Sequence, residues 1–194
     1  RTLSLPSKYG VISKAFIEPT KAQNNNNKSA ILDLYILSYN SEKKLTTSSP
    51  ALKQNLITYL SQYRMVNDTI SIKDGFIINI GVNFDIITLP EFNSNQVLMN
   101  CIEALKVYFA IDNWQINQPI ILRDIYILLD KIKGVQTVKN VEIVNLVGED
   151  LGYSPYSYDI NSAKVSNVIY PSLDPSIFEV KYPNTNIKGK ISNL

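Results

Sequence analysis

The chain has 194 residues, of which 45% are hydrophobic and 19% charged, and its formal net charge is +2. A chain of this length can form one large domain or two small ones, with a buried core. The small net charge gives no indication that the protein binds nucleic acid or an anionic membrane. There are no histidines, so the commonest general base and metal ligand is missing.

Membrane insertion and disulfide bonding are also disfavoured. No run of about 18 apolar residues is present, so we expect no membrane-spanning helix. The single cysteine, Cys101, cannot form an internal disulfide, which indicates a reducing compartment or a fold that is indifferent to redox conditions. The chain begins at Arg1 without a methionine or a secretory signal pattern, and we expect it to be a fragment or a processed product.

The first sixty residues predict strands followed by a helix. Residues Tyr9 to Glu18 are strand-like and stop at Pro19. The segment 21–30 contains four consecutive asparagines and predicts a mobile surface loop. Ile31–Tyr39 is apolar on both faces and bounded by turn residues, which favours a buried strand.

The helix that follows has a recognisable start. Ser49 can cap it, and Pro50 occupies its first position, where a missing N–H is harmless. An apolar stripe follows at helical spacing, and Asn67 and Asp68 are expected to end the helix. The stripe comprises Leu52, Leu56, Tyr59, Leu60 and Tyr63.

The clearest strand pattern follows Gly75. Thr69–Ile72 predicts a short strand, and Lys73, Asp74 and Gly75 predict a turn with a positive φ at the glycine. The run from Phe76 to Leu89 alternates with period two, which predicts a long strand with one buried and one polar face. The buried side would hold Phe76, Ile78, Ile80, Val82, Phe84 and Ile86, and the polar side Asn79, Gly81, Asn83 and Asp85.

Two helices and another strand are expected next. Asn93 is the predicted cap of a helix over 93–110, with Gln96 reaching back to it and Phe92 packing on Val97. A second helix is expected over Ile121–Lys133, ended by Gly134 in a left-handed conformation. Residues Gln136 to Val147 then predict a strand.

Beyond Gly148 the chain is loop-like, with short strands expected at Lys164–Tyr170 and Ile177–Tyr182. The predicted class is therefore α+β, with mixed sheets, three main helices packed on them and a β-rich C-terminal extension. We place the α/β core at residues 1–148 and the extension at 149–194. The extension lacks a sizeable core of its own, so it should lie against the core or against another subunit.

No catalytic, cofactor-binding or metal site is predicted, and we do not expect an enzyme. Cys101 lies on an apolar helix stripe and should behave as a small buried hydrophobe. Glu149 and Asp150 are interpreted as solvated loop charges. The aspartates at 33, 74 and 85 lack the spacing of metal ligands, and no glycine-rich phosphate-binding motif occurs.

Aromatic residues are the best candidates for an interface. Tyrosine offers a large contact area at low entropic cost, and the C-terminal extension has little core to absorb its tyrosines, although packing onto the parent domain is the alternative. Trp114 is either an anchor between the two helices or an exposed contact residue. The candidate interface residues are Tyr153, Tyr156, Tyr158, Tyr170, Tyr182 and Trp114, together with the exposed face of the 93–110 helix.

The order of these elements resembles the baseplate J-like family of contractile phage tails. The resemblance rests on the run Phe76–Leu89, the helix ending in Tyr108 and Phe109, Trp114-Gln115 with Gln118-Pro119-Ile120, and Lys133-Gly134-Val135. More closely, the chain looks like the C-terminal part of the T4-like wedge subunits that form the inner baseplate ring. That match extends to SKYGVISKAFIEP, NLITYLSQYRMVNDTISIKDGFIINIG and YPSLDPSIFEVKYPNTNIKGK, and so covers nearly the whole chain. Arg123 departs from the family, which often has a capping serine or threonine there.

The resemblance implies a structural role in the virion. Such subunits form homodimers, the dimers join into a ring, and the ring links the wedges around the central hub after assembly in the host cytoplasm. The implied partners are further copies of the chain and other baseplate wedge proteins, with no nucleic acid, membrane or cofactor. Two alternatives remain: a nucleic-acid-binding α/β sandwich module, and a tail-associated hydrolase with two carboxylates converging in a cleft.

Overall fold

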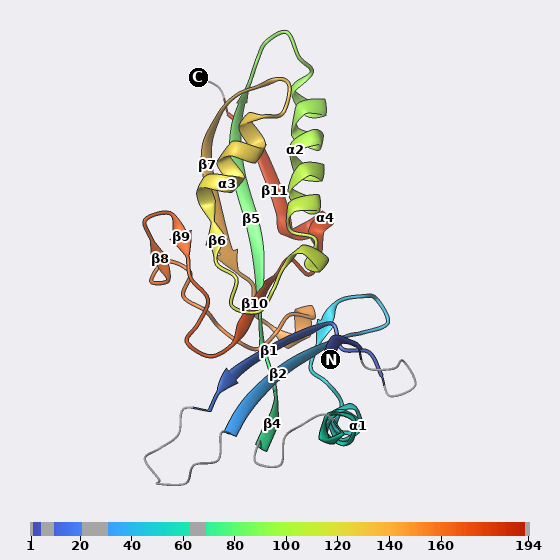
Figure 1. Ribbon diagram of the computed structural model, residues 1–194. Coiled ribbons are helices and arrows are strands. Elements are labelled where there is room, and N and C mark those ends of the chain that lie inside the picture. The colour runs from blue at the N-terminus through green and yellow to red at the C-terminus, as the bar shows by residue number, and fades with distance from the viewer. Residues whose placement is uncertain (1, 5–9, 21–30, 63–68, 193–194) are drawn as a thin grey trace. The chain divides into compact units, whose positions relative to one another are not determined.

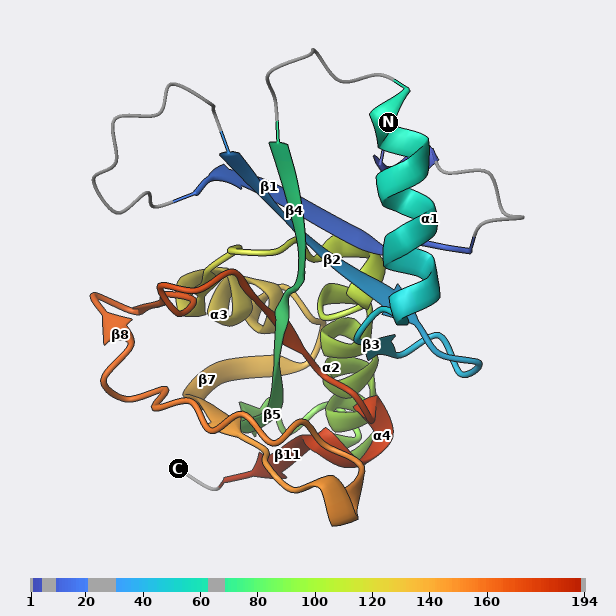
Figure 2. The same cartoon turned by 90° about the horizontal axis from the view of Figure 1, so that it is seen from below.

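The computed structural model describes residues 2–4, 10–20, 31–62 and 69–192 (Figures 1 and 2). It combines α-helices with several β-sheets, so the predicted α+β class is confirmed. The predicted loop at 21–30 and the predicted helix end at Asn67 and Asp68 lie outside the described residues. Within the described residues, no helix is long and apolar enough to cross a membrane.

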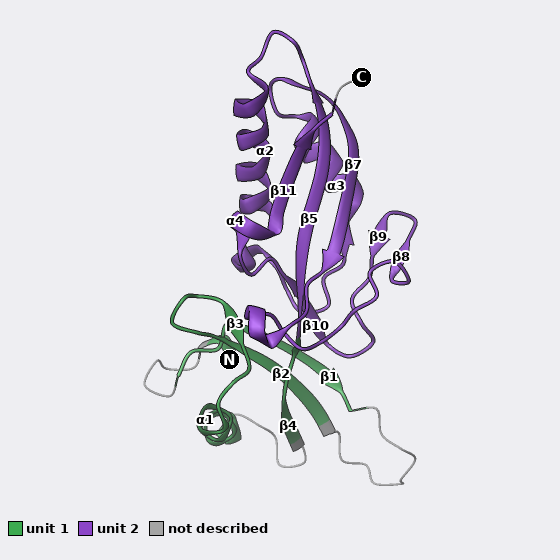
Figure 3. Ribbon diagram, turned by 180° about the vertical axis from the view of Figure 1, so that it is seen from behind, with its two compact units in different colours: residues 1–76 green, residues 77–194 purple. Residues whose placement is uncertain are grey.

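The chain divides into two compact units, residues 1–76 and residues 77–194 (Figure 3). The first unit contains β1 (Lys14–Pro19), β2 (Ile31–Tyr39), β3 (Leu45–Thr46), α1 (Pro50–Ser61) and β4 (Thr69–Asp74). The second contains all later elements and nearly all of β5 (Phe76–Thr88). The sequence-based division after residue 148 is drawn at a different place and stays a prediction.

The first unit is a mixed sheet built around β2, whose predicted bounds are confirmed. β2 pairs antiparallel with β1 and β3 and parallel with β4. Leu34 and Ile36 of β2 pack with α1 residues in one core cluster, and the α1 members are Leu52, Leu56 and Leu60. The predicted cap is also confirmed, because the Ser49 hydroxyl accepts a hydrogen bond from the Leu52 N–H at 3.2 Å.

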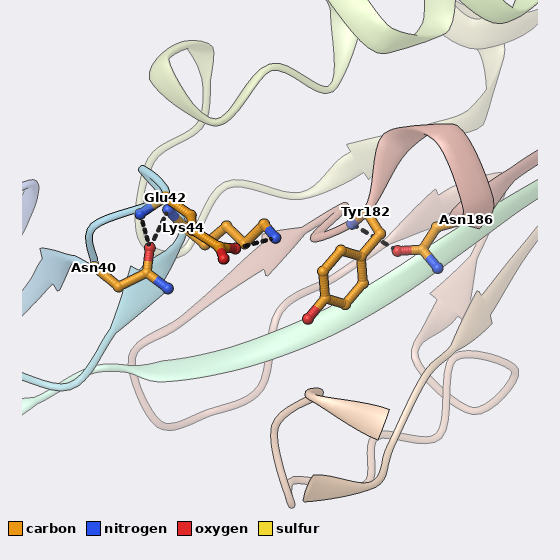
Figure 4. Close-up of polar contacts among 5 residues, drawn as sticks. All are labelled: Asn40, Glu42, Lys44, Tyr182 and Asn186. Carbon is orange, nitrogen blue, oxygen red and sulfur yellow. Dashed lines mark hydrogen bonds and ion pairs between the residues drawn. The ribbon is translucent and has the colours of Figure 1, made fainter. Parts of the chain in front are cut away.

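The turn between β2 and β3 is fixed by one side chain. The Asn40 Oδ1 accepts hydrogen bonds from the backbone N–H groups of Glu42 and Lys44, both at 2.9 Å (Figure 4). The Lys44 ammonium also lies 2.6 Å from the Glu42 carboxylate. Lys43 adopts a φ of 58° within this turn. The side-chain oxygen of Asn40 takes the place of a backbone carbonyl as acceptor for the N–H groups of the turn.

Two expectations for the first unit are wrong. The strand β1 begins at Lys14 rather than near Tyr9; Gly10 has a φ of 111°, and the described residues before Lys14 are not strand. Gly75 does not form a positive-φ turn: its N–H donates to the Ile36 carbonyl at 3.2 Å, which extends the β2–β4 pairing. The chain then enters β5 directly, and β5 pairs in a different sheet.

The second unit is organised around β5, which lies in a mixed sheet (Figure 1). β5 pairs antiparallel with β7 (Val135–Asn145) and parallel with β11 (Ile187–Ile191), and β10 (Ser176–Glu179) belongs to the same sheet. Helices α2 (Ser94–Tyr108) and α3 (Leu122–Asp130) pack on β11 and β7 and contact each other, so both cover one face of this sheet. The side chains of Ile80, Val82, Phe84 and Ile86 are buried as predicted.

The polar face of β5 is only partly open. Asn79 is completely buried: its amide group donates to Glu179 at 2.8 Å, and its Oδ1 accepts from the Ser154 N–H at 2.7 Å. Its backbone carbonyl accepts from the Leu146 N–H and the Asn145 amide. The C-terminal segment therefore covers the first half of this face with a connected polar network.

The two predicted helices are present with adjusted ends. Asn93 caps α2 by accepting from the Asn95 and Gln96 N–H groups, but the Gln96 amide donates to Asn100 instead of reaching back. Helix α3 is shorter than Ile121–Lys133; it follows β6 (Ile120–Ile121) and has no side-chain cap. Gly134 has the expected positive φ, at 98°.

The last forty residues contain more elements than predicted. The expected strand Lys164–Tyr170 is a hairpin of β8 (Lys164–Val165) and β9 (Val168–Ile169), which reverses at two positive-φ residues, Ser166 and Asn167. β9 pairs with β6. A short helix α4 (Pro183–Asn186) and the strand β11 follow β10, so this segment packs onto the sheet of β5.

Candidate interaction surface

Two of the candidate tyrosines form a half-buried pair. The rings of Tyr153 and Tyr182 meet edge to face with centroids 5.6 Å apart. The Tyr153 hydroxyl accepts a hydrogen bond from the Asn186 amide at 2.7 Å. The Asn186 Oδ1 in turn accepts from the Tyr182 N–H at 2.8 Å, as Figure 4 shows. These contacts pack the two rings onto their own chain, which is the alternative that the sequence left open.

Tyr158 is also engaged within the chain. Its ring lies 6.0 Å from that of Phe178, and its hydroxyl donates to the Tyr170 carbonyl at 2.7 Å. Burial, and secondarily the charge of Asp159, raises the pKa of Tyr158 above its ordinary value. Tyr158 therefore remains a neutral donor at neutral pH and anchors the chain that leads to Tyr170.

The remaining tyrosines are exposed. Tyr156 keeps 44% of its surface in contact with solvent and Tyr170 keeps 51%. Leu173, close to Tyr170 along the chain, is 93% exposed on a loop in which the Ser172 hydroxyl bonds the Asp174 carbonyl and the Ser176 hydroxyl. A large apolar side chain held outward on a hydrogen-bonded loop is a candidate contact residue.

Trp114 is buried, with 3% of its surface exposed. Its ring stacks on Phe109 with centroids 5.5 Å apart, meets Tyr108 edge to face, and its N–H donates to the Tyr108 carbonyl at 3.1 Å. The tryptophan therefore anchors the loop after α2. Beside it lies an open groove of about 330 Å³ lined by Ala104, Val107, Tyr108, Asn113, Trp114, Gln118 and Leu128.

The outer face of α2 presents few apolar groups. Val107 at the groove rim is 68% exposed, and Met99 is exposed two turns earlier. Between them, Lys106 and Glu103 form an ion pair of 2.6 Å. An exposed pair of this kind contributes little stability, so this face is a mixed polar and apolar surface.

The groups considered for catalysis or metal binding are separated. Cys101 is buried, and burial raises the pKa of its thiol to about 11. Asp33 and Asp74 pair with Lys73 and Lys53, respectively. Glu149 and Asp150 are exposed in a short 3-10 helix, and nowhere in the described ranges do three histidine, cysteine, aspartate or glutamate side chains gather as a metal site.

The sequence analysis did not predict that part of the β5 sheet is solvent-exposed on the face opposite the helices. Rows of directly paired residues cross β11, β5 and β7 on the face opposite the helices, starting with Lys188, Asn83 and Glu142. The next row is Lys190, Asp85 and Asn140. The alternation of β5 marked Asn83 and Asp85 as polar, but the flanking charges depend on pairings that are distant in sequence.

The chain was compared with protein families, curated proteins and solved structures. Neither a family model nor a curated protein sequence matches it. Its structure is similar to a chain of the cryo-EM structure of the anti-feeding prophage baseplate, six-fold symmetrised, with a TM-score of 0.45 and 10% sequence identity. The match covers 91% of this chain and 33% of that chain, so this chain spans about a third of the other's length.

Proposed function

We propose that this chain is a structural wedge subunit of a contractile-tail baseplate. It forms homodimers that join into a ring, and the ring links the wedges around the hub of the virion tail after assembly in the host cytoplasm. The observation that carries the proposal is the sequence resemblance, which runs from the SKYGVISKAFIEP stretch to the YPSLDPSIFEVKYPNTNIKGK stretch.

The described surface is compatible with a protein that works through contacts. Five large apolar side chains between residues 151 and 173 are exposed, and one of them, Leu173, is presented on a hydrogen-bonded loop. Single exposed apolar residues are ordinary, and an interaction site requires that such side chains form a contiguous patch. The residues on this stretch are Leu151, Tyr156, Val165, Tyr170 and Leu173.

The proposed role is mechanical and not enzymatic. Contacts of about 1,600 Å² in total would hold neighbouring subunits together, and rearrangement of the wedges on host contact would lead to sheath contraction. The chain would need no cofactor for this. Its partners would be further copies of itself and other baseplate wedge proteins.

Sedimentation velocity of the full-length protein tests self-association. The proposal expects dimers or larger species at tens of micromolar, with a population that rises with concentration. A single monomer peak throughout this range would contradict self-association.

A titration with single-stranded RNA tests the nucleic-acid alternative in the same samples. The proposal expects no binding beyond a weak association that disappears at moderate salt, because the net charge is only +2. Tight binding whose affinity falls steeply with salt concentration would replace the proposal with a nucleic-acid-binding function.

A further inference from the structure

The face of the β5 sheet opposite α2 and α3 has a regular charge pattern. The row Gly189, Phe84 and Val141 turns toward the helices, since a side-chain carbon at Gly189 would meet Leu98 of α2. Side chains alternate between the two faces of a strand, so the rows on either side of it point the opposite way. These are the two rows of Lys188, Asn83, Glu142 and Lys190, Asp85, Asn140.

The charges on this face are separated by strand. Both lysines lie on β11, whereas Asp85 lies on β5 and Glu142 on β7. Lys188, Lys190 and Glu142 are exposed and Asp85 is half-buried. In the part of the chain that the structure describes, none of the four belongs to an ion pair within 4.0 Å. On these two rows the lysines thus lie on β11 and the carboxylates on β5 and β7, while the exposed Lys139 of β7 lies beyond Asn140 at the register shift.

The charges of this face are complementary to those of the same face on a second copy of the chain that is rotated by 180°. A two-fold axis that runs parallel to β5, between two facing sheets, places β11 of each copy over β7 of the other. Lys188 then lies over the partner's Glu142, and this pairing occurs twice by symmetry. An axis across the strands would instead set the lysine edges against each other and is disfavoured by repulsion.

We propose that this open face is a contact surface for a second copy of the chain, held by reciprocal pairing of Lys188 with the partner's Glu142. The inference rests on the self-association in the proposed function and names one surface for it. Three strands at a spacing of about 4.8 Å, over the five residues of β11 at a rise of about 3.3 Å each, give roughly 240 Å² per copy. A standard interface contributes about 800 Å² per partner, so this surface contributes to a larger or multivalent assembly.

Charge reversal tests the pairing in the full-length protein. Lys188→Glu and Glu142→Lys each place like charges opposite each other, and we expect each to weaken self-association about tenfold in sedimentation velocity at low salt. The double variant K188E/E142K restores opposite charges in both pairs and should return to within about threefold of the wild-type protein. Raising the salt concentration should weaken the wild-type association and lessen the difference between variants.

Lys131→Glu is the matched control. Lys131 is an exposed lysine at the end of α3, which packs on the other face of the sheet, and its reversal makes the same change in net charge. It should leave self-association within about threefold of wild type. Circular dichroism checks that each variant is folded.

The outcomes separate this inference from the broader proposal. Self-association that neither single reversal affects, or that the double variant fails to restore, overturns this surface and leaves the baseplate proposal standing. A wild-type protein that is monomeric at all concentrations contradicts the surface and the self-association on which it rests.

Discussion

Asn79 connects segments that are far apart in the sequence. Its buried side chain joins β5 to Ser154 and to Glu179, and its carbonyl joins β5 to the end of β7. Removing one member of a buried network leaves its partners without hydrogen bonds in a region of low dielectric. The residue was recognisable as polar from the alternation of β5, but its burial depends on a segment seventy-five positions later.

We therefore expect Asn79→Leu to lower the free energy of unfolding by about 3 kcal/mol. The matched control is Asn83→Leu on the same strand, which is half-buried on the open face and should cost less than about 1 kcal/mol. Urea denaturation measures both. Equal losses for the two variants would contradict the network's role.

Burial makes the Cys101 thiol less reactive. Burial raises the pKa of its thiol from 9.0 to about 11, so the reactive thiolate is scarce at neutral pH. A thiol reagent should react with the native protein at least about 100-fold more slowly than with protein unfolded in urea. Rapid modification of folded protein at pH 7 would contradict this burial.

The same shift makes stability depend on pH. The thiol is more weakly acidic in the folded state, so its contribution to stability is fully present below pH 9 and is lost as the pH rises toward about 11. A Cys101→Ser variant lacks this titration. We expect the wild-type urea midpoint to fall more steeply than that of the variant over this interval, and parallel curves would contradict the assignment.

At the scale of elements, the turn before β7 requires glycine for two reasons. Gly134 has a φ of 98°, and a side-chain carbon there would lie 2.6 Å from the Val97 Cγ2 of α2. Gly148 also has a positive φ, but a side-chain carbon there would meet only Leu151 at 3.8 Å. Both positions have backbone strain, but only Gly134 also has a steric clash, so comparing substitutions at the two positions distinguishes the two effects.

Gly134→Ala should therefore destabilise the protein by about 3 kcal/mol, and Gly148→Ala by about 1 kcal/mol. Thermal or urea unfolding of the two variants provides the comparison. A loss at Gly134 no greater than the loss at Gly148 would show that Val97 relaxes without cost.

The strand β7 has a protected outer edge. Within the described residues it pairs only with β5, and its pairing is interrupted by two register shifts. The Val141 N–H donates to the Tyr126 hydroxyl of α3 at 3.0 Å. Irregular pairing and a side chain that occupies an edge donor both discourage the addition of another strand.

Tyr126→Phe removes that acceptor and keeps the ring. We expect a loss of about 1 kcal/mol in stability and faster hydrogen exchange at the Val141 amide, measured by NMR. Hydrogen exchange at an α2 amide such as that of Leu105 should be unaffected under conditions in which exchange does not require global unfolding. Unchanged protection at Val141 would mean that another group covers this donor.

The sequence predicted those elements whose signals are local. The bounds of β2, the Ser49 and Asn93 caps and the buried side of β5 follow from periodicity and from short-range hydrogen bonding. It did not predict β11, because the Ile187–Ile191 segment places Lys-Gly-Lys at its centre and is strand-like only through its pairing with β5. The hairpin of β8 and β9 was missed because Ser166 and Asn167 reverse the chain without glycine.

The candidate surface was predictable only in part. The tyrosine-rich composition predicted an interface on the C-terminal segment, but Tyr153 and Tyr158 make ring contacts and hydrogen bonds within their own chain. Exposure of Tyr156, Tyr170 and Leu173 depends on loop geometry that no periodicity encodes. The interface role of the candidate tyrosines and of Trp114 stays a prediction.

At the scale of the whole molecule, the two compact units are built on different sheets, each with a long central strand. In the second unit, two helices cover one sheet face while the opposite face carries separated charges. The C-terminal segment covers the first half of that opposite face at Asn79, and the part that carries these charges is open to further contacts. A subunit that links neighbours in a ring needs available surface of this kind.

We propose that the chain is a component of a contractile-tail baseplate. Electron microscopy of purified virus particles labelled with a gold-conjugated antibody against this chain tests it directly. We expect gold at the distal end of the tail, at the baseplate, in intact and contracted particles. Gold on the capsid or along the sheath, or recovery of the chain only outside the particles, would contradict it.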